Sequence, residues 1–415
     1  MHGRVAPGNP NTYNDSMGGD LWERAVPADD VWERDDVVLV QDWIGNLGGA
    51  ELVLRELATM FPRAPILTLF AVSDTVRKLG IDPARIRQSY LGRLPNANRM
   101  RKMLVPWFAD AVQTLDVGDA ALIVSASHAV AKGVPHRSYQ HHVAYVYTPA
   151  RYAHDLMPQY LRQVPAPLRP WMRSVLRNLA TWDVATANRV ERYVAISRAV
   201  AERIWRTYRR RAAVIHPPVG VEAIPLGEAH REDYYVVLSR LVANKRLDVA
   251  VRAAARLRRR LVVLGEGPER GALERLAAAE GAAKLVEFVG RVPDAEKHAL
   301  LGTARALLFP GEEDFGIVGV EALAAGTPVI AYGRAGMLDI VGASRHPMLS
   351  GRARREPGGV LFAQQSTESL AEAITIFEAD SPPEPHALRS LALRFSTSRF
   401  RQRFLELVRR TAGGG

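Results

Sequence analysis

The sequence predicts an α/β protein built from two doubly wound domains that face a central cleft. Three observations lead to this prediction. Short apolar runs alternate with amphipathic helical stretches, which is typical of a parallel sheet covered by helices. The alternation occurs twice, on either side of a segment without a regular pattern. The length of 415 residues exceeds the usual size of a single hydrophobic core.

Each half contains a series of β-branched runs that are expected to form buried strands. In the first half we expect strands at residues 37–41, 65–69, 120–125, 142–147 and 192–196, with a helix at 51–60. In the second half we expect strands at residues 234–238, 261–264, 286–289, 306–309, 329–331 and 360–362, with helices at 246–259 and 295–303. A basic amphipathic helix is expected near residues 389–410.

These elements divide the chain into five parts. Residues 1–34 are polar, rich in Gly and Asn and without the apolar core of a secretory signal, so we expect a poorly ordered extension. The first domain covers residues 35–215, a linker covers 216–231 and the second domain covers 232–381. Residues 382–415 form a C-terminal helical segment.

The charge balance limits the classes of partner. A formal net charge of +11 and a pI near 10.0 favour an anionic partner, either a nucleic acid, a membrane surface or a phosphorylated ligand. We find no recognisable nucleic-acid module, so we expect no nucleic-acid partner. No apolar run approaches the ~18 residues of a membrane span. The absence of cysteine excludes disulfides and fits a cytoplasmic protein.

The most informative segment is Pro310-Gly-Glu-Glu-Asp-Phe-Gly-Ile-Val-Gly-Val-Glu-Ala-Leu-Ala-Ala-Gly-Thr-Pro-Val-Ile-Ala331, in which a strand runs into an acidic loop and a small-residue helix. The N–H groups and dipole at the start of a helix suit a phosphate. Carboxylates at Glu313 and Glu321 suit sugar hydroxyls, although acidic residues near a helix start can also serve only as caps. The whole segment favours a site for a polyol joined to a phosphate.

Two further loops carry ligand-binding residues. In Ser239-Arg-Leu-Val-Ala-Asn-Lys245, Arg240 and Lys245 can neutralise a diphosphate without a metal, although a solvated basic turn has the same composition. Gly48 and Gly49 follow the first strand and let the backbone approach a ligand, although such pairs are often only turns. We find no D-x-D motif and no His or Cys cluster with the spacing of metal ligands, so we expect no metal and no cofactor.

The E-x7-E spacing of Glu313 and Glu321, with Phe-Gly between them and Gly-Thr-Pro-Val after them, resembles the retaining glycosyltransferases of family 4. The resemblance spans roughly residues 37–378. Within the family, the chain most closely resembles bacterial mannosyltransferases that use GDP-mannose. It implies the GT-B fold, with two Rossmann-like domains and a terminal helix that often crosses back to the first domain.

The resemblance also implies roles for particular residues. Glu313 would hold the donor sugar and act with His128 in catalysis, and Glu321 would hold the ribose. The other donor contacts would be Gly48, Gly49, Arg240, Lys245, Arg291, Val292, Phe315, Gly316, Ile317 and Val318. His128 is expected to open a helix at the end of a strand. Acceptor contacts would come from Lys132, Arg151 and Tyr152, although Tyr147 stands where the family often has a histidine, and packing roles are equally open.

The stretch Arg99-Met-Arg-Lys-Met-Leu-Val-Pro-Trp-Phe108 mixes cations with large apolar residues. It can rest on an anionic membrane, hold a lipid-linked acceptor or be an ordinary helix with a solvated face. Residues 351–356 form a basic loop that the family pattern does not contain.

Together these features predict a metal-independent hexosyltransferase. It would move mannose from GDP-mannose onto a saccharide or a polyprenyl-linked saccharide in the synthesis of cell-surface polysaccharide or glycolipid. It would lie in the cytoplasm, with the inner membrane leaflet as a peripheral site. The alternatives are a UDP-sugar donor, a hydrolase or phosphorylase of the same fold, and a non-catalytic protein that binds nucleic acid or a membrane.

Overall fold

A computed structural model describes residues 32, 35–227, 231–343 and 351–412. The expected N-terminal extension at 1–34 therefore falls almost wholly outside the described residues. The chain divides into two compact units. The N-terminal unit contains the described residues up to Pro218 together with 398–412, and the C-terminal unit contains residues 219–397.

The N-terminal unit has a seven-stranded sheet in the order β3-β2-β1-β4-β5-β6-β7. All neighbouring strands are parallel. The strands are β1 Val37–Gln41, β2 Ile66–Thr68, β3 Ile86–Gln88, β4 Leu122–Ser127, β5 His141–Val146, β6 Arg192–Ala195 and β7 Ala212–Val214. The strand order reverses between β1 and β4, and such a switch point is where open α/β sheets bind ligands, beyond the carboxyl ends of the strands.

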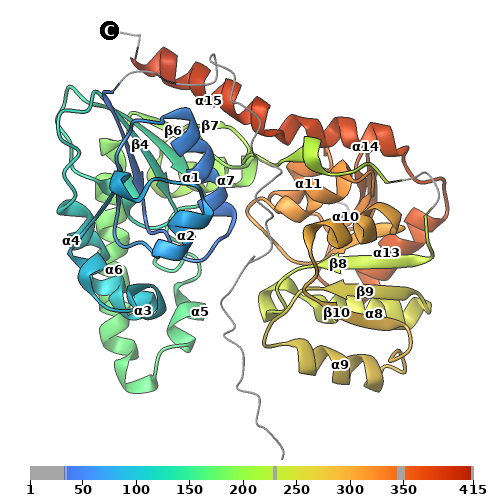
Figure 1. The fold of residues 1–415 in the computed structure, drawn as a ribbon. Coiled ribbons are helices and arrows are strands. Elements are labelled where there is room, and N and C mark those ends of the chain that lie inside the picture. Colours follow the sequence, from blue (N-terminus) through green and yellow to red (C-terminus); the bar gives the residue numbers. More distant parts are fainter. Residues whose placement is uncertain (1–31, 33–34, 228–230, 344–350, 413–415) are drawn as a thin grey trace, which may run out of the picture. The chain divides into compact units, whose positions relative to one another are not determined.

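Most helices of this unit connect its strands, and the last one lies at the C-terminal end of the sequence (Figure 1). They are α1 Gly49–Met60, α2 Ser73–Lys78, α3 Ala97–Leu104, α4 Phe108–Gln113, α5 Met157–Arg162, α6 Arg169–Ala185, α7 Arg198–Tyr208 and α15 Thr397–Ala412. The unit also contains the short 3-10 helices η5 Val105–Trp107, η6 Ala131–Gly133 and η7 Ala166–Leu168. Strands β1 and β4 are buried along their whole length.

The C-terminal unit repeats this plan with the order β10-β9-β8-β11-β12-β14-β13. Its strands are β8 Tyr234–Leu238, β9 Arg260–Leu264, β10 Val286–Gly290, β11 Ala306–Phe309, β12 Val329–Tyr332, β13 Arg354–Glu356 and β14 Gly359–Phe362. Only β13 is antiparallel, along β14. The switch point lies between β8 and β11, which pair in parallel.

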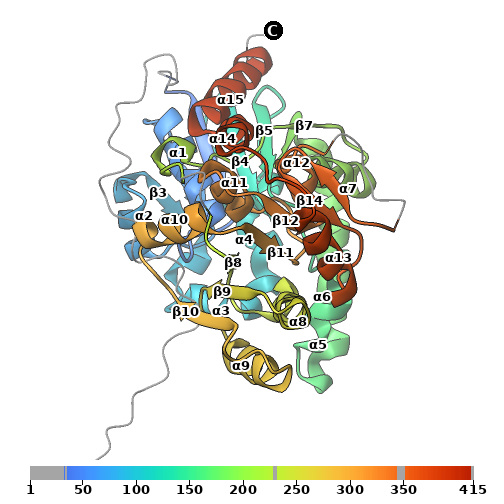
Figure 2. The same cartoon turned by 90° about the vertical axis from the view of Figure 1, so that its right-hand side faces the viewer.

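The helices of the C-terminal unit pack in two groups (Figure 2). Helix α8 Leu247–Leu257 packs against α9 Arg270–Ala279 and α13 Thr367–Glu378, whereas α11 Ile317–Ala324 packs against α10 Asp294–Thr303, α12 Met337–Ile340 and α14 Pro385–Ala392. The predicted α/β class and the doubly wound arrangement of each half are confirmed.

The structure corrects several details of the predicted elements. Strands β3, β7 and β13 were not predicted, because each has only three residues and lies at or near a sheet edge, without a long apolar run. The basic loop expected at 351–356 ends in β13. The single helix expected near 389–410 is two helices, α14 and α15, separated by a 3-10 turn and an extended Ser396.

Helix α15 belongs to the N-terminal unit. Its Phe400 and Phe404 rings lie 5.7 and 6.0 Å from the ring of Tyr145, at the centre of the sheet. Arg401 donates to the buried Glu56 carboxylate at 2.6 and 3.0 Å. Buried aromatic contacts and a buried ion pair therefore fix this helix to the N-terminal unit.

Among the described residues, no helix combines the length and apolar character that crossing a bilayer requires.

Candidate functional site

The loops after β8 and β11 form the centre of the site in the C-terminal unit. Lys245 ends the 3-10 helix Ala243–Lys245, directly before α8, and Glu313 lies in the loop between β11 and α11. The Lys245 ammonium donates to the Glu313 carboxylate in an ion pair. The two side chains retain 16% and 29% of their exposure, so a ligand can reach them. Two residues that the sequence analysis selected from separate motifs are thus in direct contact.

These two residues line a small pocket. Its wall contains the ends of β8 and β11 and their loops, formed by Val237, Leu238, Ser239, Lys245, Leu247, Leu308, Phe309, Pro310, Gly311 and Glu313. Most of this wall is apolar or backbone, and its charged groups are one ammonium and one carboxylate. With a cavity volume of about 10 Å³ the pocket has room for about one water-sized group, so a single hydroxyl or anionic oxygen of a ligand can enter it.

Arg240 comes from the same loop as Lys245. Its side chain is exposed, and within the described part of the chain its guanidinium forms no hydrogen bond or ion pair. Its backbone carbonyl accepts from the Val242 N–H and the Ser239 hydroxyl. The loop is fixed from below, because Gly265 lies so close to it that a β-carbon there would be 1.9 Å from the carbonyl oxygen of Ser239. The guanidinium of Arg240 is therefore available for a ligand on a well-anchored loop.

Helix α11 starts at Ile317, immediately after the acidic loop. Gly316 caps it with a φ of 102°, and a β-carbon at this position would come within 2.2 Å of Met337. Glycine therefore allows the sharp entry into the helix. Phe315 is buried and packs on Phe395 with 5.6 Å between the ring centroids, so only its backbone can contribute to binding. Ile317 and Val318 present the first N–H groups of the helix.

Glu321 lies in α11 and is held by Lys297 from α10. The Lys297 ammonium is 3.0 Å from Glu321 and 3.0 Å from Asp294. Burial alone would lower the pKa of Lys297, but these two carboxylates raise it above its usual range. Sequence reasoning missed Lys297, whose only signal was the i,i+3 pair with Asp294. Glu321 is thus held in place by a cation that remains fully charged.

Arg291 and Val292 follow β10, the strand at the far edge of the sheet. Arg291 is exposed and Val292 is partly buried. The structure places β10 two strands away from β8 in the sheet order, so these residues follow a different strand from the one that leads to Lys245. Their role in binding a base stays a prediction.

In the N-terminal unit, the loops after β1 and β4 are joined by Asp42. The carboxylate of Asp42 is fully buried and accepts the backbone N–H groups of His128, Ala129, Val130 and Ala131 at 2.6, 2.9, 2.7 and 2.7 Å. Sequence reasoning did not select Asp42, because nothing in the sequence links it to a segment 86 residues away.

Asp42 also orients His128. The Nδ1 atom of His128 is 3.2 Å from the Asp42 carboxylate, and the ring contacts Trp43 edge-on at 4.4 Å between centroids. Burial lowers the pKa of His128, against the opposing effect of Asp42. A neutral ring that donates from Nδ1 keeps a lone pair on Nε2. The prediction of a helix at His128 is wrong. The N–H groups of residues 128–131 donate to Asp42, and only the 3-10 turn η6 forms there.

Gly48 caps α1 and Gly49 is its first residue. The loop before them is held by Glu51, whose carboxylate accepts the N–H of Gly45 at 3.3 Å. Glu51 is 7% exposed, and its burial raises its pKa to about 7. The Tyr147 hydroxyl donates to the carbonyl of Ala50 at 3.0 Å. The glycine loop is thus fixed by two side chains that the sequence analysis did not assign to the site.

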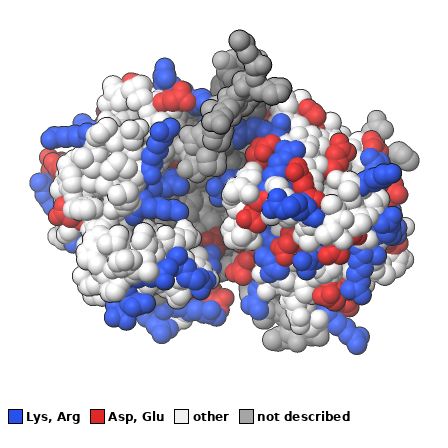
Figure 3. All heavy atoms as spheres, turned by 90° about the horizontal axis from the view of Figure 1, so that it is seen from below, with Lys and Arg blue, Asp and Glu red and all other residues white. Residues whose placement is uncertain are grey.

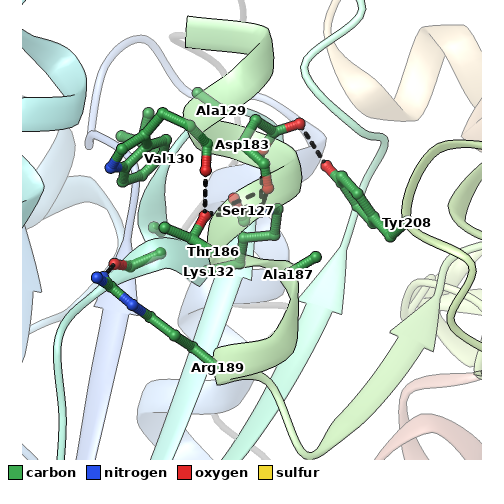
Figure 4. A network of polar contacts seen from close by, with 12 residues as sticks. Ser127, Ala129, Val130, Lys132, Asp183, Thr186, Ala187, Arg189 and Tyr208 are labelled. Carbon is green, nitrogen blue, oxygen red and sulfur yellow. Dashed lines mark hydrogen bonds and ion pairs between the residues drawn. The ribbon is translucent and has the colours of Figure 1, made fainter.

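Lys132 lies inside the N-terminal unit (Figure 4). Its ammonium is 3.0 Å from the carboxylate of Asp183 and 4.6 Å from the ring of Tyr208, and its side chain is 1% exposed. Asp183 also accepts from His154 and Tyr208, each at 2.8 Å. This network connects η6, α6 and α7, so it accounts for the buried charge of Lys132 without a ligand.

The other two expected acceptor residues also have partners within the unit. Arg151 is 3.2 Å from Asp155. The ring of Tyr152 is 5.9 Å from that of Tyr160, and its buried hydroxyl has no hydrogen-bond partner within the described residues. The acceptor roles of Arg151 and Tyr152 stay predictions.

The described residues contain no cluster of three or more His, Cys, Asp or Glu side chains arranged to hold a metal ion.

The architecture and the pocket define a class of protein. Two doubly wound α/β units, each with a parallel or mainly parallel sheet, have the architecture of the GT-B fold. Residues 222–393, which fall in the C-terminal unit, match the family "Glycosyl transferases group 1".

Curated relatives match over parts of the chain. A GDP-mannose-dependent alpha-(1-6)-phosphatidylinositol monomannoside mannosyltransferase from Mycolicibacterium smegmatis is 34% identical over 167 residues, which are 34% of this chain and 44% of the relative. A 2-deoxystreptamine glucosyltransferase from Streptomyces kanamyceticus is 40% identical over 82 residues, which are 20% of this chain and 21% of the relative. The chain thus spans less than half the length of these relatives.

Solved structures match over nearly the whole chain. HepE from Anabaena in complex with UDP has a TM-score of 0.66 at 18% identity, covering 90% of this chain and 99% of that chain. Sucrose-phosphate synthase from Thermosynechococcus elongatus has a TM-score of 0.65 at 16% identity, covering 92% and 100%. At these identities the similarity concerns the fold alone.

Proposed function

We propose that the protein is a retaining hexosyltransferase that moves mannose from GDP-mannose to a saccharide or a lipid-linked saccharide, in the synthesis of cell-surface polysaccharide or glycolipid. The observation that carries this proposal is the ion pair of Lys245 and Glu313 in the pocket at the β8–β11 switch point. The mannosyltransferase names of several curated relatives support the choice of donor.

The chemistry follows from the charges in the C-terminal unit. Lys245 and Arg240 would neutralise the diphosphate as its negative charge grows in the transition state. The N–H groups of Ile317 and Val318 would add the positive end of the α11 dipole. Because these groups act on the leaving group, they stabilise the transition state more than the ground state.

Bond changes occur on one face of the sugar. The acceptor oxygen forms a bond to the anomeric carbon as the bond from that carbon to the diphosphate oxygen breaks. The acceptor proton passes to the departing phosphate, which leaves as a nucleoside diphosphate. The proposal assigns Glu313 to the donor hydroxyls and to its ion pair with Lys245, so it uses this front-face route without a covalent intermediate.

Glu313 has two roles in this proposal. Its carboxylate accepts hydrogen bonds from donor hydroxyls, and it orients the Lys245 ammonium through the ion pair. Glu321, fixed by Lys297, holds the ribose hydroxyls. The resemblance implies that His128 would act on the transferred sugar, and Asp42 would orient its ring through Nδ1.

A thermal-shift panel tests the donor. GDP-mannose, GDP, UDP-glucose, UDP and duplex DNA are added separately, and the melting temperature is measured. Binding at 100 times the dissociation constant stabilises the fold by about 2.7 kcal/mol, which is easily detected. A shift with GDP-mannose supports the proposal, and a larger shift with UDP-glucose replaces the donor while keeping the reaction class.

An activity assay separates the remaining alternatives. Mannose transferred to an acceptor, with the anomeric configuration of the donor, is expected. Release of free mannose without an acceptor would identify a hydrolase. Steeply salt-dependent DNA binding without any nucleotide-sugar shift would identify a nucleic-acid-binding protein. Activity that survives EDTA would support the proposed independence from metals, whereas loss of activity that Mg²⁺ restores would contradict it.

A further inference from the structure

The N-terminal unit carries a group of large apolar side chains on its surface. Met103 is 68% exposed, Trp107 is 48% exposed, and Leu168 and Trp171 are each 51% exposed. Met103 and Trp107 are four residues apart across α3 and η5, and Leu168 and Trp171 are three apart at the end of η7 and the start of α6. Each pair therefore lies on one face of a helical segment.

The two pairs belong to one substructure. The Lys102 ammonium donates to the side chain of Gln163 at 3.0 Å, and the Tyr160 hydroxyl donates to the carbonyl of Lys102 at 3.1 Å. Val105 and Met172, which lie next to the exposed residues in the chain, share one hydrophobic core. We call the outer surface of α3, η5, η7 and the first half of α6 the α3–α6 face.

The charge of the α3–α6 face is strongly one-sided. Residues 87–109 contain five Lys or Arg, residues 156–182 contain four, and neither stretch contains Asp or Glu. These 50 residues therefore account for most of the formal net charge of +11. From the side that carries α3, α5 and α6, the N-terminal unit shows many basic and few acidic side chains around uncharged surface (Figure 3).

We propose that the α3–α6 face docks on an anionic lipid bilayer. Trp side chains favour the boundary between water and lipid, and exposed Met and Leu side chains can enter the acyl region. Arg and Lys around them are attracted to anionic headgroups. Single exposed apolar side chains are common on soluble proteins, but several of them on one surface are typical of an interaction site.

The position of α3 connects this docking to the proposed function, on which this step depends. Helix α3 also carries Asn98, which donates to Asn46 in the β1–α1 loop at 3.1 Å, and Arg101, which lies 6.0 Å from the ring centroid of Trp43. Trp43 contacts His128. One helix thus presents Met103 outward and borders the loop next to His128. The acceptor that suits this arrangement is a saccharide carried by a lipid in the same bilayer.

Vesicle cosedimentation of the full chain tests the docking without any sugar. Vesicles of phosphatidylcholine alone are compared with vesicles that also contain phosphatidylglycerol. We expect binding only to the anionic vesicles, and a loss of binding at high salt. A double variant, Trp107→Ser with Trp171→Ser, should weaken binding about tenfold or more. Trp205→Ser is the matched control, because Trp205 is 46% exposed on α7, outside the face.

Charge reversal gives a second test. Arg173→Glu with Arg177→Glu should weaken vesicle binding at least tenfold. Arg192→Glu with Arg403→Glu changes the net charge by the same amount at exposed positions elsewhere in the unit, and should change binding much less. All four positions are exposed, so melting temperatures should remain close to that of the unmodified protein.

The outcomes separate docking from catalysis. If anionic vesicles do not bind while GDP-mannose still stabilises the protein, the docking inference is wrong and the proposed function stands. If vesicles bind but no nucleotide sugar does, the proposed function is wrong and the docking stands. If the control pair weakened vesicle binding equally, the attraction would be a non-specific effect of charge. The assignment of the α3–α6 face as the docking surface would then be wrong. If the protein bound duplex DNA and the same variants abolished that binding, the partner of this face would be a nucleic acid and the bilayer inference would be wrong.

Discussion

Lys245 and Glu313 are 68 residues apart in the sequence and form an ion pair where β8 and β11 lie side by side. Each residue follows one of the two strands that flank the switch point of the C-terminal sheet. The pair is partly exposed, so a ligand can reach it. Solvent screens the two charges from one another when no ligand is bound. An ammonium and a carboxylate thus adjoin one another at the switch point, which is the arrangement that the proposed donor site requires.

Replacing Glu313 by Gln should lower turnover roughly 100-fold while changing donor affinity much less. The amide can still contact hydroxyls, but it no longer orients the Lys245 ammonium by charge. Steady-state kinetics and a donor titration measure the two effects. Glu312→Gln is the control, because Glu312 is an exposed neighbour in the same loop. Unchanged turnover in Glu313→Gln would remove Glu313 from catalysis.

Replacing Lys245 by Met or Arg240 by Ala should weaken binding of the free nucleoside diphosphate by roughly 10- to 100-fold, the usual effect of removing a charged hydrogen-bond donor. Isothermal titration with GDP measures the affinity. The control is Arg252→Ala on α8, which removes an exposed cation outside the pocket. Equal affinities in all three variants would show that the diphosphate binds elsewhere.

Replacing Asp42 by Asn should destabilise the protein by about 3 kcal/mol or more. The amide cannot accept all four N–H groups of residues 128–131, and its own N–H₂ group would face them. Urea unfolding measures the loss. Asp116→Asn is the control, because Asp116 is exposed and accepts a single N–H, that of Gly118. A similar small change in both variants would contradict the structural role of Asp42.

Glu51 makes stability depend on pH in a specific direction. Its pKa is raised by burial to about 7, so the protonated form favours the folded state. The resulting stability is complete below the unfolded pKa of 4.5 and is lost as the pH rises through about 7. Glu51→Gln removes the titrating carboxyl, so the stability of this variant does not fall through ionisation at position 51. Its unfolding free energy relative to the original protein should therefore rise by about 2 kcal/mol between pH 5 and pH 8.

Urea unfolding of both proteins at the two pH values measures this difference. If the difference between Glu51→Gln and the original protein were the same at pH 5 and pH 8, the carboxyl would not titrate in the folded state as its burial implies.

The sequence was most informative where one short segment contains both the strand and the charged loop after it. Glu313, Glu321, Arg240 and Lys245 were selected in this way as candidate ligand-binding residues, and the structure brings Lys245 and Glu313 into contact. Asp42, Glu51 and Lys297 were missed, because each acts through a partner on another element or through burial. The short edge strands were missed because charged residues can pair at a sheet edge without an apolar run.

The amino-acid order by itself determined the α/β class, the two doubly wound halves and the motifs beside their strands, because apolar periodicity and turn residues are local properties. Tertiary structure alone decided which loops meet, which charges are buried and which apolar side chains remain outside. Asp42 accepts hydrogen bonds from a segment 86 residues away, and Lys102 donates to Gln163, only because parallel strands and packed helices bring distant parts of the chain together.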